Sequence, residues 1–151
     1  MPHGHFKKIV IILLIPFISQ WAALYCYSEE AILFICHPNV TDTSLTERDL
    51  LNIYTGKKNK WSDNKKIKLA VLKPGSETSR TFFIKCAKKS PVQFSNYWRN
   101  MLFTGKGIPP SVFSDEDKMV AYVSSTEGAI GFVSTGKSSD KVKTIEIKWG
   151  E

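Results

Sequence analysis

Beyond residue 30, short apolar runs alternate with longer segments in which apolar positions recur at helical spacing. The runs at residues 31–37, 66–72 and 129–133 have the length of strands and are bounded by turn-forming residues, which predicts three β-strands. A fourth strand is predicted near the carboxyl end, where apolar and polar residues alternate at Ile145, Ile147 and Trp149.

Four helices are predicted from the signals at which they begin. A capping box at residues 44–47, with Ser44 as the cap, starts a helix that ends at Gly56. A second helix starts at Ser76 and runs towards Ala87, and the others start at Ser90-Pro91 and within the acidic cluster 114–117. The predicted core combines their apolar faces with Trp61: Leu50, Ile53, Tyr54, Ser79, Phe82, Phe83, Cys86, Phe94, Tyr97, Trp98, Met101, Leu102, Met119, Val120 and Val123.

Alternating strands and helices predict an α/β fold of three layers, in which helices flank a mostly parallel sheet. The chain has 151 residues, 42% of them hydrophobic, which suits a single globular domain and excludes a disordered chain.

The first 28 residues have the pattern of an export signal. Lys7 and Lys8 precede an apolar stretch at residues 9–18, and Cys26 and Ser28 occupy the −3 and −1 positions of a cleavage site before Glu29. This pattern predicts a periplasmic domain at residues 29–151. Two alternatives use the same segment: a lipid anchor on Cys26, ranked second, and an uncleaved membrane anchor over residues 9–27, ranked third.

The chain is basic, and removing Lys7 and Lys8 with the signal lowers its net charge from +7 to +5. A positive field favours anionic ligands or surfaces, whereas export argues against nucleic acid as a partner. The dense lysine run between the first predicted helix and the second strand is interpreted as a solvated surface: Lys57, Lys58, Lys60, Lys65 and Lys66.

Two cysteines, Cys36 and Cys86, lie in the predicted exported domain. In an oxidising compartment they could form a disulfide, but both occupy apolar surroundings that suit buried free thiols equally well. The pattern predicts no metal site and no cofactor, and we expect no enzyme, because nucleophile elbow, zinc-ligand and phosphate-loop motifs are all missing and only His37 is left as a candidate base.

Three separated motifs resemble the phosphate-binding proteins of ABC transporters. The sequence LLNIYTGK at residues 50–57, followed by Trp61, resembles that family's IYLGK…W segment, and EGAIGFV at residues 127–133 is similar to its PGAIGYV. Short, single-domain members of the family carry a YW…FTGKG…PP segment. This segment resembles YW at residues 97–98, FTGKG at 103–107 and PP at 109–110.

The resemblance implies a type 2 periplasmic binding protein fold, but only about one of its two lobes. It implies an exported solute-binding domain that takes phosphate or a similar small oxyanion for ABC transport or sensing. A single lobe supplies half of such a cleft, so the expected partners are a second lobe, a second copy of the chain or a membrane permease. The alternative is a protein-interaction domain that has kept the fold and lost the ligand site.

The expected binding residues are Ser76, Thr78, Ser79 and Arg80, at the start of the second predicted helix. Free N–H groups at a helix start attract anions, the hydroxyls add hydrogen-bond donors, and arginine binds phosphate or sulfate with two donors. The family's loop reads Ser-Gly-Thr after an arginine, whereas here Glu77 stands between Ser76 and Thr78 and Arg80 lies inside the helix. The competing interpretation is that Ser76 only caps the helix.

Overall fold

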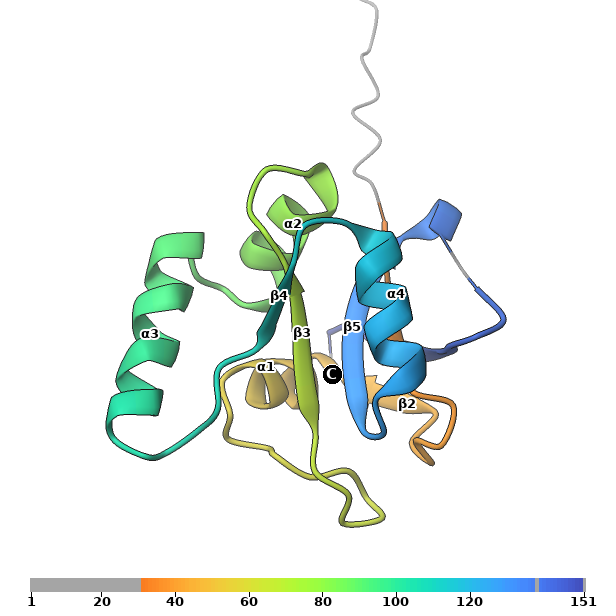
Figure 1. The fold of residues 1–151 in the computed structure, drawn as a ribbon, viewed down its shortest axis with the longest axis horizontal. Coiled ribbons are helices and arrows are strands. Elements are labelled where there is room, and N and C mark those ends of the chain that lie inside the picture. Colours follow the sequence, from red (N-terminus) through yellow and green to blue (C-terminus); the bar gives the residue numbers. More distant parts are fainter. Residues whose placement is uncertain (1–30, 138, 151) are drawn as a thin grey trace, which may run out of the picture.

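A computed structural model describes residues 31–137 and 139–150, which form a six-stranded sheet with helices on both faces (Figure 1). In chain order the elements are β1 (Ile32–Cys36), β2 (Ser44–Thr46), α1 (Glu47–Tyr54), β3 (Lys68–Leu72), α2 (Glu77–Thr81), the π-helix η1 (Phe82–Cys86), α3 (Pro91–Phe103), β4 (Ser111–Phe113), α4 (Glu116–Ser125), β5 (Ala129–Ser134), the 3-10 helix η2 (Thr135–Lys137) and β6 (Lys143–Lys148). The export signal predicted for residues 1–28 lies outside the described residues.

The strand order is β2-β6-β1-β5-β3-β4. Only β1 runs antiparallel to its neighbours, β5 and β6, whereas β2 pairs with β6, and β3 with both β4 and β5, in parallel. Five of the six strands therefore point the same way. The mostly parallel sheet predicted from the sequence is confirmed.

The two faces of β5 contact different helices. Gly131 faces α4, because a Cβ at this position would lie 2.8 Å from the sulfur of Met119. Phe132 points to the other face, where its ring stacks on that of Phe82 from η1 with a centroid distance of 4.2 Å and also contacts Tyr54 of α1. The helix α3 packs on the outside of this second layer, since the indole N–H of Trp98 donates to the backbone oxygen of Tyr54. This arrangement confirms the three layers.

The first helix begins two residues later than predicted. Ser44 is not its cap: residues 44–46 form β2, which pairs with β6, and Thr46 caps α1 by accepting a hydrogen bond from the backbone N–H of Asp49. The carboxylate of Asp49 accepts from the backbone N–H of Thr46 and so completes the capping box. The chain stays extended through Ser44 because pairing with β6 uses its backbone hydrogen-bonding groups.

At the edges of the fold, one strand was not predicted and two predicted positions need correction. The Pro109-Pro110 segment leads into a short edge strand, β4, which the sequence pattern does not predict. Trp149 follows the end of β6 and is exposed, and Leu102 is an exposed residue of α3. These positions lie where the sheet and the helix layer end, so no second layer covers them.

Both cysteines of the described chain are free thiols and both are buried. Burial raises the pKa of Cys36 to about 11 and that of Cys86 to about 12. Because the thiolate is the reactive form, neither thiol should react readily at neutral pH while the protein is folded.

We therefore expect iodoacetamide at pH 7.5 to leave Cys36 and Cys86 unmodified in the native protein and to modify both in urea. Peptide mapping by mass spectrometry measures each site separately, so that Cys26, outside the described residues, does not interfere. A peptide linked through Cys36 and Cys86 in the unreduced protein, or rapid labelling of the native chain, would contradict this prediction.

Candidate functional site

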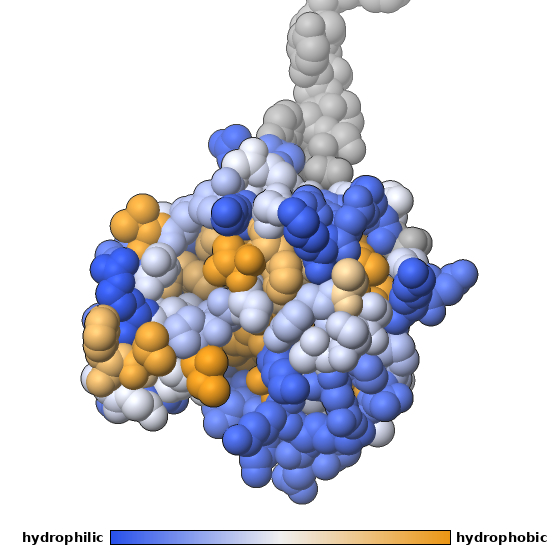
Figure 2. Space-filling view, viewed as in Figure 1, coloured by the Kyte–Doolittle hydropathy of each residue, from blue (hydrophilic) through white to orange (hydrophobic). Residues whose placement is uncertain are grey.

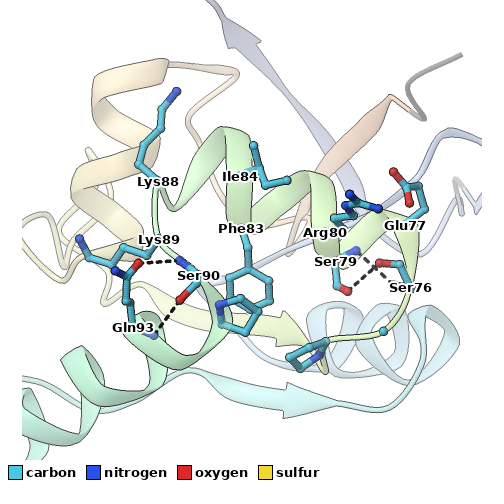
Figure 3. A pocket seen from close by; sticks show the side chains of 13 residues that line it. Ser76, Glu77, Ser79, Arg80, Phe83, Ile84, Lys88, Lys89, Ser90 and Gln93 are labelled. Atoms are coloured by element: carbon cyan, nitrogen blue, oxygen red, sulfur yellow. Dashed lines mark hydrogen bonds between the residues drawn. The ribbon is translucent and has the colours of Figure 1, made fainter. Parts of the chain in front are cut away.

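The loop after β3 carries the chain from the sheet into α2. Gly75 has a φ of +136°, a conformation that side chains other than glycine rarely adopt. The next residue, Ser76, caps α2 by accepting a hydrogen bond of 3.1 Å from the backbone N–H of Ser79 (Figure 3). The helix then continues as the π-helix η1 up to Cys86. Because π-helical turns are frequent at functional sites, this segment is a candidate for one.

A cavity of about 780 Å³ lies along this helix (Figure 3). Its walls come from the loop before α2, from α2 and η1, and from the start of α3, where Ser90 and Gln93 form a capping box. It is lined by Pro74, Gly75, Ser76, Glu77, Ser79, Arg80, Phe83, Ile84, Lys88, Lys89, Ser90, Pro91 and Gln93. Two helix starts and a mixed polar and apolar surface therefore meet in one cavity.

The charges of this cavity are mainly positive. The Nζ atom of Lys88 forms an ion pair of 3.0 Å with Glu47, and that of Lys89 lies 5.5 Å from the ring centroid of Tyr97. Arg80 is exposed, and its guanidinium has no side-chain partner among the described residues. Of the cationic groups here, the Arg80 guanidinium is the one most available to an anion.

The four predicted binding residues share one helical turn but divide into two pairs. Ser76 and Arg80 are exposed, whereas Thr78 and Ser79 are buried. The Thr78 hydroxyl donates to the carboxylate of Glu116 over 2.7 Å and does not line the cavity. The Ser79 hydroxyl donates to the backbone oxygen of Ser76 over 2.8 Å. Of the four predicted residues, Ser76 and Arg80 are therefore the two that present exposed polar side chains to the cavity.

Glu116 connects three elements behind the site. Its two carboxylate oxygens accept hydrogen bonds from Thr78 of α2 and from Ser134 of β5, the latter over 2.8 Å. The carboxylate itself stands in the first turn of α4, where the helix dipole stabilises negative charge. This linkage fixes the position of α2 relative to the sheet and to α4.

Sequence reasoning did not assign Lys88, Lys89, Ser90 and Gln93 to this site. They lie eight or more residues beyond Arg80, and the bend at Lys88, which has a φ of +51°, returns the chain to the same cavity. The capping box at Ser90 was visible in the sequence, but its proximity to Ser76 was not, because it depends on the direction in which the chain leaves η1.

No group of three or more metal-binding side chains occurs within residues 31–137 and 139–150. Over the same residues, the helices are too short or too polar to cross a bilayer.

Comparison with known protein families gives a match over most of the chain. The model of a protein family described as a PBP superfamily domain matches residues 18–148. No curated protein matches the chain.

Several solved structures share the fold. A putative phosphate ABC transporter substrate-binding protein from Clostridium perfringens, with bound phosphate, has a TM-score of 0.64 at 20% identity over 78% of this chain and 45% of its own. PstS from Borrelia burgdorferi has a TM-score of 0.62 at 16% identity over 79% of this chain and 47% of its own. An ABC-type phosphate transport receptor from Vibrio cholerae has a TM-score of 0.55 at 19% identity, over 78% and 46%.

The chain thus spans less than half the length of these solved structures. At this level of identity the likeness concerns the fold, and it confirms the prediction of one lobe of a type 2 periplasmic binding protein.

Proposed function

Since the chain belongs to the PBP superfamily domain family, we propose that it is an exported solute-binding domain whose cavity beside α2 holds a small oxyanion, phosphate or sulfate. The observation that carries the proposal is the placement of Ser76 and Arg80. Both are exposed, and both line one cavity at the start of a helix.

These two residues offer complementary donors to an oxyanion. The oxygen of Ser76 accepts from the N–H of Ser79, so the hydroxyl proton is available to a ligand oxygen. The guanidinium of Arg80 can donate two parallel hydrogen bonds to two ligand oxygens. Lys88 and Lys89 add positive charge to the same cavity. A phosphate placed between Ser76 and Arg80 would therefore receive donors from two directions.

Glu77 favours phosphate over sulfate as the ligand. Its side chain also lines the cavity and repels a fully ionised anion. Hydrogen phosphate carries a proton that a carboxylate can accept, whereas sulfate has none at neutral pH. We expect phosphate to bind more tightly for this reason.

The cavity is much larger than an oxyanion, which is consistent with a half-site. A second lobe, a second copy of the chain or a membrane permease would close it, in transport or in sensing. We further propose a periplasmic location, reached through the signal in residues 1–28, with a lipid anchor at Cys26 as the second choice.

Calorimetric titration of phosphate into the purified chain, with sulfate as the second ligand, tests the proposal. We expect saturable phosphate binding that Arg80→Ala weakens by at least about tenfold, because a charge-assisted hydrogen bond is lost. Arg99→Ala, which removes an exposed arginine of α3 outside the cavity, should leave the affinity unchanged.

Two results would count against the proposal. One is the absence of binding heat up to about 10 mM phosphate, because a dissociation constant above this value is too weak for a receptor. The other is equal weakening in Arg80→Ala and Arg99→Ala, which would indicate a diffuse attraction to positive charge. Either result would favour the protein-interaction domain, in which Ser76 only caps α2.

A further inference from the structure

A second cavity, of about 440 Å³, lies at the opposite end of β3 and β4 from the candidate oxyanion site. It is lined by Lys68 and Ser111, the first residues of β3 and β4, whereas the first cavity begins beyond the carboxyl end of β3. The other walls come from the end of α1 with the loop after it, and from the connection between α3 and β4. The two cavities share none of their lining residues.

Apolar side chains form the floor and part of the rim of this second cavity. The floor includes Ile67 and Leu69, which are half-buried and pack against the core. Ile53 and Trp98 also line the cavity but are themselves buried. At the rim, the side chain of Ile108 is 85% exposed although it lines the cavity. An exposed isoleucine beside an apolar floor would gain free energy if a ligand covered it.

Two glycines allow the walls of the cavity to pack closely against the Trp98 ring. A Cβ atom on Gly56 or on Gly107 would lie 3.0 Å from the indole ring, closer than ordinary contacts allow. The absence of side chains at these positions therefore lets the loop after α1 and the connection after α3 approach the same ring from two directions. The concave shape is thus a consequence of specific residues in both walls.

Lysines surround the cavity, and no aspartate or glutamate lines it: the lysines are Lys58, Lys60, Lys66, Lys68 and Lys106. The Nζ atom of Lys58 lies 3.0 Å from a carboxylate oxygen of Asp49. The other four form no ion pair with any described residue. Figure 2 shows the hydrophilic surface concentrated at this end of the molecule, next to hydrophobic patches. Like charges around a concave apolar surface focus a positive potential into it.

We propose that the second cavity binds a small amphiphilic anion, a monocarboxylate with an apolar chain or ring, independently of the oxyanion site. The apolar floor and Ile108 would cover the hydrocarbon part, and the unpaired lysines would hold the carboxylate. Inorganic phosphate leaves the apolar surface uncovered, and a cation is repelled by the lysines. The cavity has the volume and the mixed lining of small-molecule sites, which favours a single soluble ligand over a membrane surface.

Titration with decanoate tests this proposal, with decanol as the uncharged probe of the same chain length. We expect saturable decanoate binding and much weaker decanol binding. The double variant Lys60→Gln/Lys68→Gln should weaken decanoate binding about tenfold, while Lys141→Gln/Lys148→Gln, which removes the same charge from outside both cavities, should not. Ile108→Ser should also weaken it, in contrast to Phe103→Ser, since Phe103 is 80% exposed but lies outside the cavity.

Other outcomes would overturn the proposal. The first is the absence of saturable decanoate binding below the critical micelle concentration, and the second is equally tight binding of decanol. The third is an equal loss of affinity in the test and control variants. The fourth is binding to phosphatidylglycerol vesicles without binding of decanoate. An excess of phosphate should not displace decanoate, because the sites lie at opposite ends of β3. Failure of either site can therefore be recognised separately from failure of the other.

Discussion

Replacing Phe132 by alanine is expected to lower the free energy of unfolding by about 3–5 kcal/mol, the range for deleting a buried aromatic side chain. Phe132 is fully buried in β5, between two neighbouring strands. Its ring stacks on Phe82 with an interplanar angle of 9° and lies 6.1 Å from the ring of Phe34. The substitution removes the ring that joins the sheet to η1 and leaves a cavity that the rigid sheet cannot close.

Urea unfolding followed by circular dichroism measures this loss. Phe103→Ala is the matched control, because it deletes the same side chain from an exposed position of α3 and should change the free energy by less than about 0.5 kcal/mol. Equal effects of the two substitutions would show that the aromatic cluster around Phe132 is not the centre of the core. Since a domain of this size has about 5–15 kcal/mol of stability in total, the expected loss is a large share of it.

The parts of the fold that follow from local signals were predictable. The N-cap at Ser90 with its proline and glutamine, the acidic start of α4 and the apolar run of β5 all have local physical causes. The antiparallel direction of β1 was not predictable, because strand direction depends on how distant segments pair and leaves no trace in the spacing of apolar residues. The edge strand β4 was missed for a related reason: three residues after two prolines show no alternation long enough to recognise.

The two candidate sites were predictable only in part. The loop around Ser76 could be found because a helix start carries its own signal and the family resemblance adds to it. The burial of Thr78 could not, since it depends on Glu116, which lies 38 residues further along the chain. The lysine run after α1 was interpreted as a solvated surface. The structure places Lys60 and Lys66 at one cavity with Lys106, which a sequence pattern cannot reveal.

The turn before β5 is the second position at which a small change should have a large effect. Gly128 is buried and has a φ of +78°, and a Cβ atom there would lie 2.2 Å from the backbone oxygen of Lys66. Its own backbone oxygen accepts hydrogen bonds of 3.0 Å from the indole N–H of Trp61 and from the N–H of Lys68. An alanine here combines backbone strain with a contact that only movement of the main chain can relieve.

We expect Gly128→Ala to lower the free energy of unfolding by more than about 2 kcal/mol, measured by urea denaturation. Gly136→Ala is the matched control, because a Cβ atom there meets no neighbour within 4 Å; it should leave stability unchanged or slightly higher. A Gly128→Ala variant as stable as the native protein would show that the turn can relax. Relieving the contact separates the turn at residue 128 from the backbone of Lys66, which lines the second cavity. The folded fraction of Gly128→Ala should therefore bind decanoate more weakly while keeping its affinity for phosphate.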